Sequence, residues 1–408
     1  YFVDDSGDTI VEQVDEGNDS VTSSVSFTLS ANVERLYLSG TEAIDGTGNA
    51  SANWLYGNVG NNRLDGGAGA DVMNGSSGTD VYVVDNAGDV VEDWQFADGD
   101  TVEASIDWKL DDFSENLVLT GAALHGKGSY MDKILTVNAA DNRLDGGGGA
   151  DTLQGGTGND TYVVDNSGDQ VIEQANEGID TVESNVSWTL SANVENLRLT
   201  GDSVINATGN ALDNDLRGNA AGNVIDGGSG NDQLDGEGGN DTYLFGFGDG
   251  RDVISEAFDT APEKYNVLLF NPGVAAANVS LARVGDDLVA SLSAGQDQVT
   301  IRNYFFGEDP GNGLNPIQQI RFDDSTVWDF QTINDILNPP NTAPVLNIPI
   351  ADQSVAEGSV INFAVPVNAF VDFDAGDSLT YSATLADGSA LPAWLSFNPS
   401  NRTFTGMA

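Results

Sequence analysis

The sequence has 408 residues, with 49 glycines, no cysteine, and 64 acidic against 14 basic side chains, which gives a formal net charge of −50. This charge excludes a nucleic-acid partner, because phosphate binding needs a basic surface, and it favours a cation with oxygen ligands. The lack of cysteine excludes disulfides and zinc thiolates, and no apolar run is long enough to form a transmembrane segment.

Residues 1–242 contain three copies of one long unit. The segment Tyr1–Asp8 recurs as Tyr82–Asp89 and as Tyr162–Asp169, and a fainter copy begins at Tyr243, so that the steps are 81, 80 and 81 residues. Repetition at a fixed long period is typical of solenoid proteins, in which each repeat packs on its neighbours.

Each unit contains a block of tandem nonapeptides. The best copies begin at Gly66, Gly155 and Gly227, with Asp at the sixth position and an apolar residue at the eighth. The first six residues predict a turn and the last three a short strand whose middle side chain points inward. The predicted core therefore consists of the eighth positions: Leu55, Leu64, Met73, Tyr82, Leu135, Leu144, Leu153, Tyr162, Leu216, Ile225, Leu234 and Tyr243.

Stacking of these strands about 4.8 Å apart also stacks the turns, so that each Asp lies beside the turn of the next coil. Carboxylate and carbonyl oxygens can then share an ion of the size of Ca²⁺, which takes six to eight oxygens. We expect folding to be coupled to calcium, because the Asp side chains repel one another without the ion.

The nonapeptides resemble those of the RTX (repeats-in-toxin) family. The resemblance implies several calcium ions, bound by the sixth-position Asp and by carbonyls of the glycine turn. The ligand residues carried over are Gly66, Gly69, Asp71, Gly75, Gly78, Asp80, Gly146, Gly149, Asp151, Gly155, Gly158, Asp160, Gly227, Gly230, Asp232, Gly236, Gly239 and Asp241. Asn62, Asn142 and Asn223 take the sixth position elsewhere and predict weaker or empty sites, and Lys133 is expected to cap or end its row.

Between the blocks, runs such as Thr181–Trp188 alternate apolar and polar residues and predict further coils of the same solenoid. Residues 243–337 resemble the haemolysin-type calcium-binding-related domain and predict a β-rich cap for the open core. Residues 338–344 predict a linker.

Residues 345–408 resemble part of a cadherin-like, dystroglycan-type immunoglobulin sandwich. Asp372, Asp374 and Asp377 are either a calcium site beside the linker or a plain polar loop. Both ends of the chain are expected to continue in a longer protein, such as a large RTX adhesin.

The predicted fold is all-β: a right-handed parallel β-roll or β-solenoid with a β-rich capping module and a partial immunoglobulin-like sandwich. Without a Ser/His/Asp set, a P-loop or a zinc motif, we expect no enzyme. The leading hypothesis is an extracellular or cell-surface module, structural or adhesive, that folds on Ca²⁺ after type I secretion. It would contact cell-surface or matrix polysaccharide, or copies of itself. The alternatives are an accessory region of a secreted protease, lipase or polysaccharide-modifying enzyme, and a self-assembling filament or surface-layer subunit.

Overall fold

The computed structural model describes residues 1–92, 94, 99–256, 264–293, 295–309, 313–339, 341–374 and 377–408. The chain divides into two compact units, Tyr1–Ile333 and Asn334–Ala408. The finer boundaries predicted from the sequence, after residues 242, 337 and 344, stay predictions.

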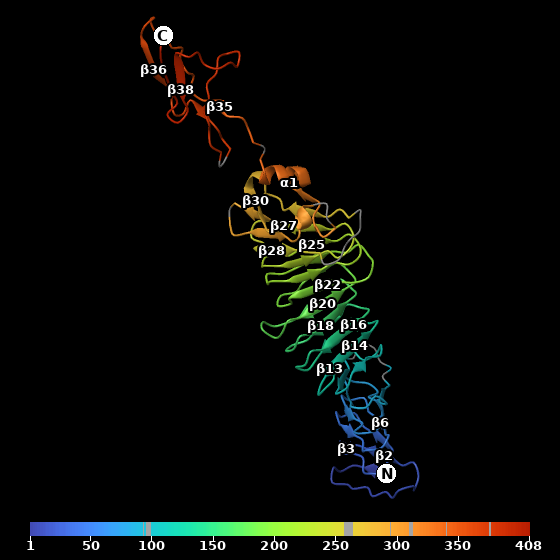
Figure 1. The fold of residues 1–408 in the computed structure, drawn as a ribbon. Helices are drawn as coiled ribbons and strands as arrows, with labels where there is room; N and C mark the ends of the chain where they lie inside the picture. Colours follow the sequence, from blue (N-terminus) through green and yellow to red (C-terminus); the bar gives the residue numbers. More distant parts are fainter. Residues whose placement is uncertain are drawn as a thin grey trace. The chain divides into compact units, whose positions relative to one another are not determined.

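The first unit is a parallel β-solenoid (Figure 1). From β2 to β29, consecutive strands alternate between sheets, and the neighbours within a sheet are strands two places apart that pair in parallel; β1 pairs in parallel with β2. One pair of sheets contains β1 (Phe2–Val3), β2 (Ser20–Ser23), β4 (Arg35–Leu38), β6 (Trp54–Tyr56), β8 (Val72–Asn74) and β10 (Val90–Val91) in the first sheet, and β3 (Phe27–Thr28), β5 (Gly46–Thr47), β7 (Arg63–Asp65), β9 (Val81–Val84), β11 (Thr101–Ala104), β13 (Asn116–Leu119), β15 (Ile134–Thr136), β17 (Thr152–Gln154) and β19 (Gln170–Ile172) in the second.

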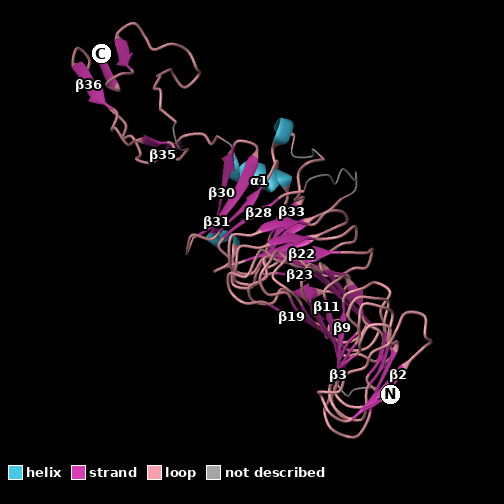
Figure 2. Ribbon diagram, turned by 90° about the horizontal axis from the view of Figure 1, so that it is seen from below, coloured by secondary structure: helices cyan, strands magenta, loops and turns pink. Residues whose placement is uncertain are grey.

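Two further sheets continue the stack. The third sheet alternates first with the later strands of the second sheet and then with the fourth sheet. The third contains β12 (Trp108–Lys109), β14 (His125–Ser129), β16 (Arg143–Gly147), β18 (Thr161–Val164), β20 (Thr181–Ser184), β22 (Asn196–Leu199), β24 (Asp215–Arg217), β26 (Gln233–Asp235) and β28 (Arg251–Ile254), and the fourth contains β21 (Trp188–Thr189), β23 (Ala207–Thr208), β25 (Val224–Asp226), β27 (Thr242–Phe245) and β29 (Val267–Phe270). Figure 2 shows the strands stacked in order, with the connecting turns gathered along the edges.

Two nonapeptides make one coil of this solenoid. Leu55 pairs with Met73 in one sheet, and Leu64 pairs with Tyr82 in the other. All twelve predicted core residues are at most 1% exposed. The prediction that every eighth position points inward is therefore confirmed.

The segments between the blocks also form coils. β20 pairs with β18 on one side and with β22 on the other, both in parallel. Its burial alternates, with Val182 and Ser184 inside. The alternation read from the sequence thus continues the same solenoid, although the nonapeptide motif is lost.

The parallel stack ends in antiparallel strands. β32 (Gln298–Ile301) still pairs in parallel with β28, but it then pairs antiparallel with β31 (Asp287–Leu292), which pairs with β30 (Val279–Val284). On the other side β33 (Gln319–Arg321) pairs antiparallel with β34 (Val327–Trp328). In the described part of the chain, the helical elements are the 3₁₀ turns Ala276–Asn278 and Phe306–Glu308 and the helix α1 (Phe330–Leu337).

Aromatic side chains replace the aliphatic core at this end. Phe270 lies between Phe245 and Phe322, with ring centroids 6.1 and 5.0 Å away, and Phe322 packs on Trp328 at 4.6 Å. Large rings close the open interior of the last coil, as expected of a capping module.

The second unit contains two small antiparallel sheets. One consists of β35 (Val345–Leu346) and β37 (Phe370–Val371), and the other of β36 (Val360–Ala364), β39 (Thr403–Met407) and β38 (Leu395–Asn398) in that order. Among its described residues, the buried apolar side chains are Val365 and Ala369. The all-β character predicted for this unit from the sequence is confirmed, and its sheets are antiparallel.

Candidate metal sites

The sixth-position Asp residues form rows along the edges of the solenoid, each directly before a strand. In each case one carboxylate oxygen accepts a backbone hydrogen bond from the coil below. The N–H groups of Asn53, Lys133 and Asn142 donate to Oδ1 of the Asp found 18 residues later, at 2.7 Å each. The acceptors in these three bonds are Asp71, Asp151 and Asp160. Each carboxylate is therefore held beside the backbone of the turn in the coil below.

The second oxygen of these carboxylates lacks a protein partner. Oδ2 of Asp71, Asp151, Asp160 and Asp232 is buried without a hydrogen bond among the described residues. Burying an ionised oxygen without a partner costs several kcal/mol, at least about 1–3 even for a neutral polar group. Such a cost at repeated positions is explained by a cation with oxygen ligands, and the donor set of carboxylates and carbonyls fits one.

The first glycine of each nonapeptide faces this oxygen. A Cβ placed on Gly66 would lie 2.4 Å from Oδ2 of Asp71, and one on Gly146 would lie 2.1 Å from Oδ2 of Asp151. No side chain fits at these positions, so the turn can close around its own Asp only with glycine. The same close approach to the Asp of the same turn occurs at Gly75, Gly155, Gly227 and Gly236.

Glycine is required at the fourth position of the nonapeptide for a different reason. Gly158 has a φ of 130°, and a Cβ there would lie 2.4 Å from the carbonyl oxygen of Ala140 in the previous coil. Positive φ combined with close stacking excludes other residues. Positive φ is also found at Gly69, Gly78, Gly149, Gly230 and Gly239.

Burial raises the pKa of these carboxyl groups. The pKa of Asp71 rises to about 6 and that of Asp151 to about 7, mainly because burial removes water and secondly because neighbouring acids add repulsion. The pKa values of Asp160 and Asp232 rise to about 6 for the same reason. A bound cation would remove this penalty by favouring the charged form.

The sixth-position Asn residues satisfy themselves largely within the protein. The amide of Asn62 donates to the carbonyl of Ile44 at 2.6 Å, and its Oδ1 accepts from the N–H of Asn58 at 2.8 Å. Asn223 makes the equivalent bonds to Ile205 and Asn219, whereas Asn142 donates to Ala123 at 3.1 Å but keeps a buried Oδ1 with no partner among the described residues. Weak or absent metal binding at these positions stays a prediction.

Lys133 places a positive charge at the same position. Its buried ammonium donates to the carbonyls of Asp112 and Ser114 at 3.1 and 2.9 Å. The strands do not end there, because β15 pairs with β13 below and β17 above. The row of Asp side chains does start anew above it, since the N–H of Lys133 donates to Asp151.

Sequence reasoning missed the next acid in each row. The N–H of Asp71 donates to Oδ1 of Asp89, and that of Asp151 to Oδ1 of Asp169, both at 3.0 Å. The signal was available, because both acids close the recurring Gly-Asp marker of the long unit, 18 residues after a sixth-position Asp. Asp100, Asp180 and Asp252 play the same part 20 residues after Asp80, Asp160 and Asp232.

In the second unit, the three predicted acids come together. Carboxylate oxygens of Asp372, Asp374 and Asp377 lie within 4.8 Å of one another. Two of them also hold the segment before β35, since the N–H of Thr342 donates to Oδ2 of Asp374 at 2.5 Å and the amide of Asn341 to Oδ2 of Asp377 at 2.6 Å. Whether this loop binds a cation stays a prediction.

A stack of glycine turns with repeated buried carboxylates defines a calcium-binding solenoid. The RTX calcium-binding nonapeptide repeat (4 copies) matches residues 47–82, 134–171 and 208–243. The haemolysin-type calcium binding protein related domain matches residues 287–332, and the family described as "Putative Ig domain" matches residues 343–408. The chain is an RTX-like protein whose nonapeptide repeats bind calcium.

Two known proteins are similar to parts of the chain. The iron-regulated protein FrpA of Neisseria meningitidis serogroup C is 30% identical over 96 residues, which is 24% of this chain and 8% of FrpA. The endo-1,3-1,4-beta-glycanase ExsH of Rhizobium meliloti (strain 1021) is 44% identical over 66 residues, which is 16% of this chain and 14% of ExsH. The matches thus span a small part of either relative. RTX repeat proteins are typically secreted, and none of the helices in the described residues is long and apolar enough to cross a membrane.

Proposed function

We propose that this chain is a calcium-dependent extracellular module that Ca²⁺ folds and stiffens after export by type I secretion. The observation that carries the proposal is the arrangement of the buried carboxylates of Asp71, Asp151 and Asp160: one oxygen of each accepts a backbone hydrogen bond, and the other has no hydrogen bond to a described residue. Asp71, Asp151, Asp160 and Asp232 would hold the ions together with turn carbonyls, and Asp80 and Asp241 occupy the equivalent positions.

The net charge of −50 supports coupling of folding to calcium. A compact chain with this charge repels itself, and bound divalent ions turn part of that repulsion into cross-links between coils. Extracellular calcium, near millimolar, fills sites of the 10⁻⁴–10⁻³ M class, whereas cytosolic calcium leaves them empty. The chain would therefore stay unfolded until it leaves the cell.

Far-UV circular dichroism during a calcium titration tests this proposal, with magnesium as the matched control. We expect a coil-to-β transition near millimolar Ca²⁺ and none with Mg²⁺, because Mg²⁺ is smaller and gives up its water reluctantly. A chain that is fully folded in excess chelator at neutral pH would contradict the proposal.

The role of the module would be structural and adhesive, with polysaccharide as the partner. An outward-facing group of aromatic rings on β4 and β6 favours this partner. Tyr37 and Tyr56 stack with ring centroids 4.9 Å apart and planes 3° from parallel, and Trp54 lies 6.3 Å from Tyr56. Tyr37 and Trp54 are 37% and 42% exposed, and such amphipathic rings are enriched where proteins meet partners.

Binding of the calcium-loaded chain to a β-1,3-1,4-glucan tests the aromatic group. We expect Trp54→Ala to weaken binding about tenfold, which corresponds to about 1.4 kcal/mol, because it removes the largest exposed ring of the group. Trp394→Ala, at a comparably exposed ring in the second unit, should bind like the unsubstituted chain. Equal affinities of all three proteins for the glucan would contradict binding through these aromatic rings.

An accessory role in a secreted enzyme is the second candidate, because ExsH is a glycanase by name and matches 66 residues of this chain. The solenoid is of a kind typical of non-enzymatic regions, and we propose that this segment itself has no catalytic role. Hydrolysis of the same glucan by the isolated chain would contradict that.

A further inference from the structure

Three buried acids meet where the second repeat block ends. Carboxylate oxygens of Asp160, Glu173 and Asp180 lie within 4.8 Å of one another, and the three residues are 1%, 6% and 1% exposed. Asp160 directly precedes β18, Glu173 follows β19 and Asp180 directly precedes β20. Two of the three acids therefore come from the segment after the nonapeptides.

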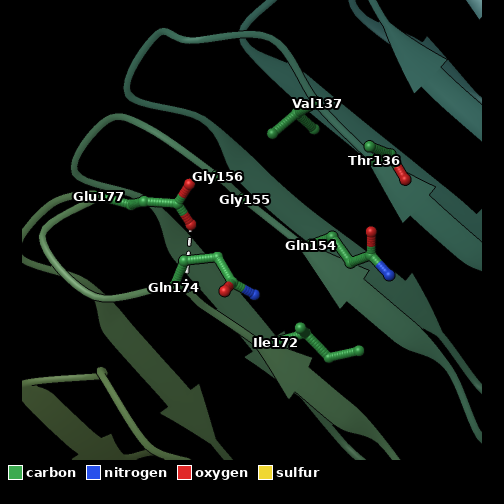
Figure 3. A pocket seen from close by; sticks show the side chains of 8 residues that line it. All are labelled: Thr136, Val137, Gln154, Gly155, Gly156, Ile172, Gln174 and Glu177. Atoms are coloured by element: carbon green, nitrogen blue, oxygen red, sulfur yellow. Dashed lines mark hydrogen bonds between the residues drawn. The ribbon is translucent and has the colours of Figure 1, made fainter.

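This segment runs back along the last glycine turn of the block. Figure 3 shows Ile172, Gln174 and Glu177 beside the Gly155–Gly156 turn, with the N–H of Gln174 bonded to Oε2 of Glu177 at 2.9 Å. The carbonyl of Glu177 also accepts a hydrogen bond from the N–H of Gly158 at 2.9 Å. The backbone thus carries Glu173 and Asp180 to the turn that holds Asp160.

Each of the three acids has one carboxylate oxygen that accepts a hydrogen bond and one with no hydrogen bond to a described residue. The N–H of Asn142 donates to Oδ1 of Asp160 at 2.7 Å, the N–H of Asp160 donates to Oδ1 of Asp180 at 2.8 Å, and the phenol of Tyr162 contacts Oε1 of Glu173. The remaining oxygens, Oδ2, Oδ2 and Oε2, are buried with no hydrogen bond in the described part of the chain. Three such oxygens in one place cost far more than one, because their charges also repel.

The end of the third block has the same arrangement with a built-in cation. The N–H of Asp241 donates to Oδ1 of Asn266 at 2.7 Å, and the phenol of Tyr243 to Oε1 of Glu256 at 3.5 Å. The ammonium of Lys264 lies 2.6 Å from Oε2 of Glu256, with the two side chains 5% and 1% exposed. An amide thus replaces the third acid here, and a lysine neutralises the second.

We propose that Asp160, Glu173 and Asp180 form a divalent-cation site that takes Ca²⁺, in which Glu173 and Asp180, both outside the nonapeptides, join the sixth-position Asp160. After the third block the ammonium of Lys264 takes the role of the ion, because two carboxylates and an ammonium are found there in place of three carboxylates and an ion. All the offered ligands are oxygens, which is the set that Ca²⁺ prefers. The site would pin the segment between β19 and β20 to the repeat turn. It rests on the proposed function only in that the protein meets calcium.

The number of Ca²⁺ ions bound by the full chain, measured by equilibrium dialysis, tests the site. We expect Glu173→Gln to bind one ion fewer than the unsubstituted chain, because the variant loses one of three charges. The matched control Glu256→Gln should lose none, because Lys264 already serves that acid. An unchanged count for Glu173→Gln would overturn the inference.

The calcium dependence of thermal melting separates a metal ligand from a packing residue. Over calcium concentrations at which both chains are folded, the melting temperature should rise more steeply with calcium for the unsubstituted chain than for Glu173→Gln, because each ion that binds only the folded form adds to the rise. Equal slopes for the two chains would mean that Glu173 only packs, and would also overturn the inference.

Different outcomes would contradict the proposed function and the proposed site. If the unsubstituted chain bound no calcium at all, the proposed function would fail together with this site. If the chain bound calcium and Glu173→Gln bound the same number of ions, only this site would fail.

Discussion

At the buried sixth position of the nonapeptide, three kinds of side chain deal with buried polar atoms in three different ways. Asp71 leaves an oxygen for an ion, Asn62 turns an amide to the carbonyl of Ile44, and Lys133 brings an ammonium to two carbonyls. Each satisfies the same requirement, which is that buried polar atoms find partners. We therefore expect the residue at this position to decide whether a coil needs calcium.

Replacing Lys133 tests this view at the residue scale. Lys133→Met should lower the free energy of unfolding by about 1–3 kcal/mol, because the carbonyls of Asp112 and Ser114 lose their donor. The loss should be similar at two calcium concentrations that both support the fold, since no ion is involved, as measured by urea unfolding at each concentration. Lys109→Met, at an exposed position of β12, should unfold like the unsubstituted chain. A loss that changes with the calcium concentration would argue against this role.

At the scale of the element, the nonapeptide is half a coil, and its glycines set how closely the coils approach. The glycine at the first position faces the carboxylate of its own turn, and the glycine at the fourth position packs against the backbone of the coil below. Strands of three residues, such as β8 and β17, are too short to be stable alone and gain their stability from the stack. A defect in one turn should therefore affect the neighbouring coils.

Two glycines of one turn provide a matched pair for this prediction. Gly146→Ala should weaken calcium binding and destabilise the fold, because its Cβ would lie 2.1 Å from Oδ2 of Asp151. Gly148→Ala should be tolerated, because its Cβ would meet atoms of Tyr130 no closer than 3.6 Å. Calcium titrations followed by circular dichroism compare the two variants. Equal effects would mean that close approach to the carboxylate is not what requires glycine at the first position.

At the scale of the whole molecule, the acids couple stability to pH. Burial raises the pKa of Asp71 to about 6, of Asp151 and Glu173 to about 7, and of Asp252 to about 8, against about 4 in an unfolded chain. In the calcium-free state the folded form thus binds more protons than the unfolded form between these values. Its stability falls as the pH rises from about 4, and levels off above the folded-state pKa values.

The chain in chelator should therefore gain β structure when the pH is lowered from about 8 to about 5. The calcium-loaded chain should behave oppositely, because protons compete with the ions for the carboxylates. Far-UV circular dichroism against pH measures both trends. Repetition in high salt, which screens surface charges but not buried ones, separates the buried acids from general self-repulsion. Less β structure at the lower pH in chelator would show that the buried acids do not control the calcium-free fold.

The sequence by itself determined the repeat, the inward-facing eighth positions and the sixth-position Asp rows, because a period of nine residues with glycine turns admits one stacked arrangement. The alternation in Thr181–Ser184 also sufficed to extend the solenoid beyond the nonapeptides. Local pattern is enough where each residue's environment repeats along the chain.

Only the tertiary structure showed that Glu173 and Asp180 join Asp160, and that Lys264 serves Glu256. These residues lie in the segments after the second and third blocks, where the period of nine residues is lost and the two segments differ in length: Asp180 follows Asp160 by 20 residues, whereas Asn266 follows Asp241 by 25. Which side chains meet there depends on how the backbone returns to the stack, and the sequence pattern carries no record of that path.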